Sequence, residues 1–246
     1  MAKATKAAAM RDETTTLADY EATIDSETRR LENEQAHEIF VHAPVRCLRI
    51  ALATYSTGGK PADCLKWIDR GCDYKLRFFA KKNFAFPGYG QLLEDFEFLP
   101  TSSLVGRADE MIDGFRRCRF EKDPVPRVRG LINQLSAVLK GEPVVETKPE
   151  TDDLKKNGKP LLTLPPVLKA VSKHDAAAFA KSLGEYLVKS RARDVKQLAR
   201  LPFYVGRWSM FAAGMCSVFG GIPALPAAAR QYVPIELVEY ALKRTK

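Results

Sequence analysis

The sequence has few histidines and no paired cysteines, so it lacks the usual ligands of metal and redox centres. Three histidines occur in 246 residues, and the five cysteines are scattered without a C-x-x-C pair. No glycine-rich phosphate-binding motif and no H-E-x-x-H motif is present. We therefore expect no metal, no cofactor and no enzyme activity. The odd number of cysteines, all within apolar helical patterns, predicts reduced, buried thiols in a cytoplasmic protein.

Long runs of alternating apolar and polar residues are also missing, whereas helical periodicity recurs in nearly every segment. Apolar residues from Val45 to Tyr55 and from Leu65 to Phe79 form two stripes separated by a Gly-Gly-Lys-Pro turn. This pattern predicts an antiparallel helical hairpin, with Lys66, Asp69, Arg70 and Asp73 on the solvent-exposed face of its second helix. Similar stripes flank Pro124 and Pro126, and Gly141 is predicted to end the second of them. Candidate N-caps are Thr101-Ser102-Ser103 and Asp175. We predict an all-α, multi-helix bundle built from antiparallel helical hairpins.

An uninterrupted membrane-spanning run is absent as well. Residues 208–229 carry no charge, but Gly220-Gly221, Pro223 and Pro226 interrupt them, and a spanning helix needs about 20 apolar residues. The pattern instead predicts a buried helix from about Phe203 to Phe219 in a soluble core. Small residues along one face (Ser209, Ala213 and Ser217) would let a neighbouring backbone approach closely. Arg207, at the edge of this helix, needs a partner, and Glu236 and Glu239 are the candidates.

Composition divides the chain into four parts. Residues 1–16 are predicted to be a disordered leader, and 17–140 an N-terminal helical half. Its first helix spans about Leu17–Val41 and has a thin apolar stripe, Leu17, Ile24, Leu31 and Ile39, which should face inward. Residues 141–160, polar and rich in proline and glycine, are predicted to be an exposed linker. Residues 161–246 form a C-terminal helical half that we expect to pack on the first as one domain.

Charge is unevenly distributed, with a net +9 overall but nine acidic and five basic side chains in residues 1–40. Such a field favours anionic partners. The most suggestive basic cluster interleaves cations with aromatic residues between positions 77 and 90. A structural interpretation, with the aromatics in the core, is about as plausible here as a binding one. We take as the candidate partner-binding residues Arg77, Lys81, Lys82, Phe84, Phe86 and Tyr89.

Several segments together resemble a known family. The hairpin RCLRIALATYSTGGKPADCLKWIDRGCDYKLRFF, the helix DAAAFAKSL (Asp175, Phe179 and Leu183) and the end FAAGMCSVFGGIP…YVPIEL (Tyr232, Pro234 and Leu237) are similar to segments of bacterial polymorphic-toxin immunity proteins. The similarity is to the helical family called immunity protein forty-nine, and a related family of nuclease-effector immunity proteins has a similar C-terminal pattern. It covers residues 44–240 and rests on packing positions, with no catalytic residue among them.

The resemblance implies a cytoplasmic protein that neutralises a cognate toxin, delivered by contact or by a secretion system, through stoichiometric binding. Inhibitors of nucleases are often acidic, and this chain is basic. Either the toxin is not a nuclease, or the contact uses the acidic N-terminal residues 1–40 of this chain or an acidic surface of the toxin. Two alternatives remain: a helical-repeat scaffold, which should show a constant period near 34 residues, and a basic nucleic-acid-binding regulator, whose binding should depend strongly on salt.

Overall fold

The computed structural model describes residues 10–38, 40–80, 97–117, 126–144, 163–192, 195–196 and 205–244. Within these residues the fold is all-α and contains no strand. The helices are α1 (Leu17–Ala36), α2 (Ala43–Ser56), α3 (Pro61–Ala80), the 3-10 helix η1 (Ser102–Val105), α5 (Ala108–Arg117), α6 (Pro126–Leu139), α8 (Leu164–Ser172), α9 (Ala176–Tyr186), the π-helical turn η3 (Leu187–Arg191), α11 (Met210–Phe219), α12 (Ala227–Arg230) and α13 (Ile235–Arg244).

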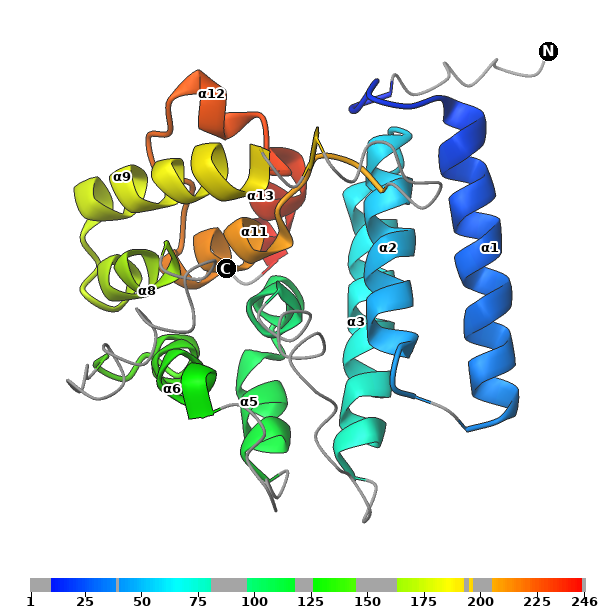
Figure 1. Cartoon of the computed structure of the whole chain (residues 1–246), viewed down its shortest axis with the longest axis horizontal. Helices are drawn as coiled ribbons and strands as arrows, with labels where there is room; N and C mark the ends of the chain where they lie inside the picture. Colours follow the sequence, from blue (N-terminus) through cyan, green and yellow to red (C-terminus); the bar gives the residue numbers. More distant parts are fainter. Residues whose placement is uncertain are drawn as a thin grey trace.

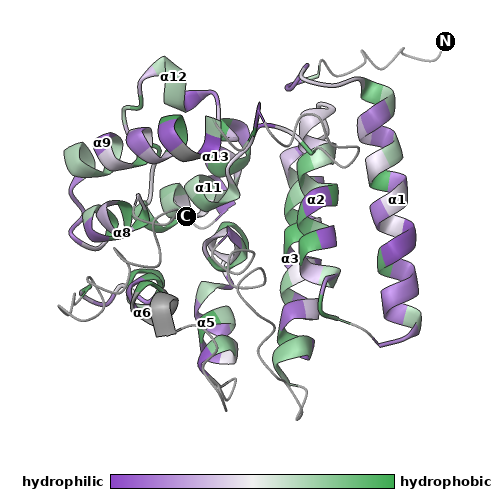
Figure 2. Cartoon of the chain, in the orientation of Figure 1, coloured by the Kyte–Doolittle hydropathy of each residue, from purple (hydrophilic) through white to green (hydrophobic). Residues whose placement is uncertain are grey.

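Two groups of helices pack across one core. The upright helices α1, α2 and α3 lie side by side at one end of the molecule, and α8, α9 and α11 to α13 gather at the other end (Figure 1). A single apolar cluster runs through both groups and includes Leu65, Phe115, Phe179, Met215 and Val238. Apolar residues line α2 and α3, whereas α1 is mostly polar (Figure 2). The bundle of antiparallel hairpins predicted from helical periodicity is therefore confirmed.

The hairpin α2–α3 follows the sequence pattern closely. Leu65, Ile68 and Cys72 are buried, and the predicted wet-face residues Asp69 and Asp73 are exposed. Gly58, in the turn between the helices, has a φ of 88°, a left-handed value that glycine adopts without strain. Beyond the hairpin, Asp175 caps α9 as predicted, because its Oδ1 accepts a hydrogen bond from the Ala178 amide at 2.9 Å.

The central buried helix is shorter than predicted. It begins at Met210, not Phe203, because Ser209 takes an extended conformation and its hydroxyl caps the Ala212 amide at 3.2 Å. All residues from Met210 to Cys216 are buried. No helix in the described ranges combines the length and the apolarity needed to cross a bilayer.

A backbone does approach this helix closely, but at a residue outside the predicted small row. A Cβ added to Gly214 would lie 2.3 Å from the Pro100 carbonyl carbon, so only glycine fits there. Thr101 and Ser103, predicted as N-caps, have a different role. Their hydroxyls donate to carbonyls, including Gly214 O at 3.0 Å from Ser103 Oγ. The chain here forms η1 and then a left-handed Gly106 before α5 begins.

The N-terminal helix also differs from its prediction. It ends at Ala36 rather than Val41, and Leu17, expected to face inward, is 44% exposed. Its buried face contains two carboxylates, Glu27 and Glu34. Glu27 pairs with Arg46 at 2.8 Å and with Arg49 at 3.1 Å. The thin apolar stripe therefore suffices because buried ion pairs complete the contact between α1 and α2.

Candidate functional site

A row of alternating aromatic and arginine side chains runs along one face of α3. We call its members, Trp67, Arg70, Tyr74 and Arg77, the α3 stripe; their spacing of three, four and three residues places them on one helical face. Both arginines are exposed, Trp67 is half-buried and Tyr74 is buried. The ring of Tyr74 thus lies in the protein while the charges that flank it face the solvent.

Direct contacts hold the stripe together. The Arg70 guanidinium lies 5.1 Å from the centre of the Trp67 ring, and its Nε donates to the Tyr74 hydroxyl at 3.2 Å. The Arg77 guanidinium lies 6.0 Å from the Tyr74 ring and 5.9 Å from Phe40, whose ring stacks on Tyr74. Cations over aromatic faces are attracted by the ring quadrupole. These contacts restrict both arginines and so reduce the entropy that binding a partner would cost.

Acidic neighbours of the stripe share one arginine, Arg107. Asp69 and Asp73 accept hydrogen bonds from Arg107 Nη1 at 3.0 and 2.7 Å, and Glu110 accepts from Arg107 Nε at 2.7 Å. The bond to Glu110 is the largest contribution that raises the pKa of Arg107, and burial opposes it. Arg107 thus offsets part of the negative charge of these three carboxylates, and Arg70 and Arg77 remain as exposed cations on the stripe itself.

Only one of the residues predicted to bind the partner lies in the described part of the chain. Arg77 is exposed near the end of α3, as the prediction requires. Outside the described residues lie Lys81, Lys82, Phe84, Phe86 and Tyr89. From the sequence, Arg70 was assigned to a face that contacts only solvent, and Trp67 was not recognised as a candidate binding residue. The sequence does contain the information, because the spacing of Trp67 and Arg70 places them on the same helical face as Tyr74 and Arg77.

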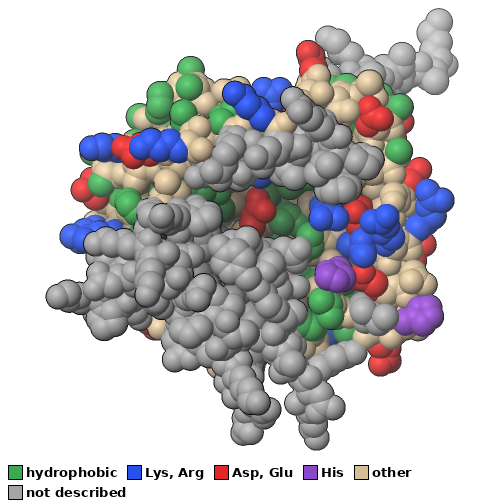
Figure 3. Space-filling view, in the orientation of Figure 1, with side chains coloured by type: hydrophobic (Ala, Val, Ile, Leu, Met, Phe, Trp, Pro, Cys, Tyr) green, Lys and Arg blue, Asp and Glu red, His purple; other side chains and the backbone are tan. Residues whose placement is uncertain are grey.

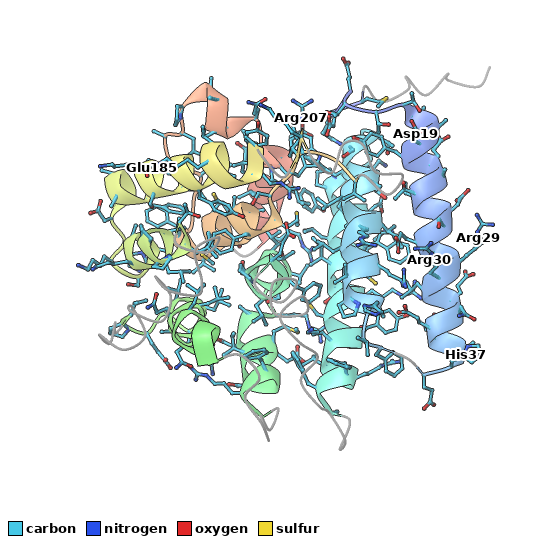
Figure 4. All side chains as sticks on the ribbon, in the orientation of Figure 1. Asp19, Arg29, Arg30, His37, Glu185 and Arg207 are labelled. Carbon is cyan, nitrogen blue, oxygen red and sulfur yellow. The ribbon has the colours of Figure 1, made fainter. Side chains whose placement is uncertain are left out.

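Arg207 does not pair with Glu236 or Glu239, as the sequence had suggested. Its guanidinium donates to Asp12 Oδ1 at 2.9 Å, and its backbone amide donates to Asp12 Oδ2 at 2.7 Å. Glu236 accepts instead from Arg11, at 2.7 Å. The predicted disordered leader is therefore wrong for residues 10–16, which contact both groups of helices; Figure 4 labels Arg207 at their junction.

Asp12 is fully buried at this junction. Burial alone would raise the pKa of its carboxyl group, but hydrogen bonds from Arg207 and Thr14 outweigh it and lower the pKa from 3.8 to about 2. Next to this ion pair, Trp208 Nε1 donates to Ser56 Oγ at 2.9 Å, and Ser56 Oγ donates to the Val205 carbonyl at 3.0 Å. The segment joins the α2–α3 hairpin to the C-terminal helices.

The outer face of α1 has the opposite charge to the α3 stripe. Residues 10–38 contain nine acidic and three basic side chains, a net of −6, so the rest of the chain carries +15. Exposed along α1 are Asp19, Glu21, Asp25 and Glu32. Figure 4 labels Asp19 near the start of this helix and Arg29 and Arg30, the cations beside these acids, further along it.

The described cysteines are poor nucleophiles. Cys47, Cys64, Cys72 and Cys216 are all buried, and burial is the main cause that raises the pKa of each thiol, to about 12 for Cys47, Cys64 and Cys216. Thiolates, the reactive form, are therefore scarce at neutral pH. Within the described ranges, no group of three or more His, Cys, Asp or Glu side chains is arranged to hold a metal ion.

Comparison with known proteins gives a fold relationship. No protein-family model and no curated protein matches the sequence. The structure is similar to the crystal structure of protein PA2201 from Pseudomonas aeruginosa, with a TM-score of 0.65 and 19% sequence identity over 98% of this chain and 93% of that one. At this level of identity the similarity shows that the two chains share a fold.

Proposed function

We propose that this chain is an immunity protein, a cytoplasmic protein that binds one cognate antibacterial toxin and neutralises it by occlusion, without turnover. The observation that carries the proposal is the α3 stripe. Trp, Tyr and Arg are the residue types that most often dominate the binding energy of protein interfaces. The stripe also lies within residues 46–79, a segment that resembles a helical hairpin of immunity proteins.

The charge of the stripe indicates the kind of surface it would bind. Its two arginines and the +15 carried outside residues 10–38 favour a toxin with an acidic face. A toxin that binds nucleic acid would instead present a cationic face, and the acidic outer face of α1 would be its complement. We propose the α3 stripe, continued by the predicted residues Lys81 and Lys82, as the contact, and charge reversal separates the two possibilities.

The test uses the C-terminal domain of a secreted protein encoded immediately upstream of this chain as the toxin. Arg70→Glu/Arg77→Glu should slow association about tenfold or more while leaving the melting temperature within a few degrees of wild type. The control Lys60→Glu/Lys243→Glu makes the same charge change at exposed positions away from the stripe. It should leave the association rate and protection of toxin-expressing cells nearly unchanged.

Three results would count against this account. Equal association rates for the stripe variant and its control would exclude the stripe as the contact. Loss of binding on Glu21→Lys/Asp25→Lys alone would move the contact to α1. Absence of both a complex and protection with the wild-type chain would refute the immunity function itself.

The large positive charge also favours a second candidate function, that of a nucleic-acid-binding regulator. A gel-shift assay with duplex DNA and with RNA at 50 and 200 mM salt distinguishes it, since phosphate contacts lose much of their affinity over that range. We expect no retardation at either salt concentration. A complex at 50 mM salt that weakens strongly at 200 mM, without toxin binding, would favour the regulator.

A further inference from the structure

Helices α8 and α9 pack together at the end of the molecule opposite α1 (Figure 1), and residues of both helices line a groove. Its volume is about 450 Å³, within the range of sites that bind small molecules or short peptide segments. The two helices run antiparallel and are joined by a tight turn at His174, which has a left-handed φ of 50°. Small residues, Ala170 and Ala178, line the groove and leave room for an incoming chain.

Lysines from both helices and from the turn line the groove. They are Lys169 on α8, Lys173 in the turn and Lys181 on α9, and all three are exposed. Basic side chains (blue) are visible along α8 and α9 at this end of the molecule (Figure 3). Positive charge thus surrounds a concave surface.

The two carboxylates that line the groove are engaged elsewhere. Asp175 caps α9 by accepting from the Ala178 amide at 2.9 Å. Glu185, labelled on α9 in Figure 4, accepts from Lys189 at 3.1 Å, and Lys189 does not line the groove. Lys189 offsets the charge of Glu185, and the cap fixes Asp175 at the start of α9, so Lys173 and Lys181 can present positive charge to a ligand.

The lining selects among anionic ligands. It contains no aromatic residue and no arginine, whereas surfaces for single-stranded nucleic acid stack bases on aromatic rings and on guanidinium groups. Lysine ammonium groups are point charges that accommodate carboxylates spaced along a peptide. Alanines along the groove allow close approach of a peptide main chain.

We propose that the α8–α9 groove binds an extended acidic segment of a protein. The site is separate from the α3 stripe and independent of the proposed immunity function. The presence of Lys173, in the turn, and Lys181, on α9, around one groove lined with alanine carries the proposal.

The experiment titrates the full chain against a fluorescein-labelled hexaglutamate peptide at low salt and follows fluorescence anisotropy. Hexaglutamine and a single-stranded dT6 oligonucleotide are the comparison probes. Lys173→Glu/Lys181→Glu should weaken hexaglutamate binding about tenfold or more, because each reversal replaces attraction with repulsion. Lys60→Glu/Lys243→Glu, with the same change in net charge, should have little effect. In the wild type, amide NMR signals of Ala178 and Lys181 should shift on titration.

Each remaining outcome overturns the proposal. Equal weakening by both double variants would show attraction to overall charge without a site. Tighter binding of dT6 than of hexaglutamate, lost in the groove variant, would assign the groove to phosphate. Absence of saturable hexaglutamate binding would remove the site altogether. Since no toxin is used, none of these results bears on the immunity function.

Discussion

Replacing Asp12 by asparagine removes the charge that joins the N-terminal segment to Arg207. In the wild type the pKa of this carboxyl group falls from 3.8 to about 2, because the hydrogen bonds from Arg207 and Thr14 outweigh burial. A difference of nearly two pKa units corresponds to about 2 kcal/mol of folding free energy at neutral pH. Asp12→Asn should therefore lower the free energy of unfolding at pH 7 by about that amount.

The sign of the pH dependence follows from the lowered pKa. The contribution of Asp12 is fully present above the unfolded value of 3.8 and is lost as the pH falls toward 2. Urea denaturation followed by circular dichroism, between pH 7 and pH 2.5, should show that the wild type loses more stability than Asp12→Asn over the acidic part of this range. The two curves should converge at its lower end.

The neighbouring Glu13 provides a matched control, since it is exposed. Glu13→Gln removes the same charge from the same segment and should change stability by less than about 0.5 kcal/mol. Equal stability of Asp12→Asn and Glu13→Gln at pH 7, or parallel acid curves for Asp12→Asn and the wild type, would show that residues 10–16 do not anchor the fold.

Three further changes test the packing and the chemistry of the thiols. His174→Gly should raise the free energy of unfolding by about 0.5–1 kcal/mol in urea titrations, because glycine adopts the left-handed φ of 50° at this position without strain. Lys173→Gly, one residue earlier at a right-handed position, should lower the free energy of unfolding. Gly214→Ala should cost about 3 kcal/mol or prevent folding, since its Cβ would lie 2.3 Å from Pro100 C, and Gly221→Ala, which meets open space, should be nearly neutral in the same assay. In a Cys118→Ser background, a disulfide reagent at pH 8 should react only on unfolding with Cys47, Cys64, Cys72 and Cys216; rapid labelling of the native protein would contradict their burial.

The sequence predicted those elements whose signals are local. Helical periodicity and the Gly-Gly turn were enough for the α2–α3 hairpin, and Asp175 was recognised as a cap because the preference for Asp at N-caps depends only on the adjoining backbone. Gly141 was likewise predicted to end its helix, and its φ of 67° is the left-handed value expected there.

The errors came from contacts between residues far apart in the chain. Asp12 and Arg207 are separated by 195 positions, and nothing local to either one identifies the other. The central helix begins later than predicted because the backbone amide of Ser209 donates to the Tyr232 carbonyl at 2.8 Å, a tertiary contact. The burial of Glu27 was not predicted from the sequence, because a carboxylate is buried only when cations such as Arg46 pair with it.

The candidate site was predictable in part. Arg77 was identified from its mixture of charge and aromatic neighbours, but the stripe extends toward the start of α3 rather than only toward its end. Finding Trp67 and Arg70 required asking which exposed arginines share a helical face with aromatic rings. The ion pairs of Asp69 and Asp73 with Arg107, which lies 38 and 34 positions away from them, required the tertiary structure.

The central claim is that this chain acts by forming a complex with a toxin. The most direct measurement is light scattering coupled to size-exclusion chromatography of the chain mixed with the toxin domain encoded upstream. We predict a single peak with the summed mass of one copy of each protein and loss of toxin activity at a one-to-one ratio. Separate peaks at micromolar concentration, or inhibition at far less than one copy per toxin, would contradict stoichiometric occlusion.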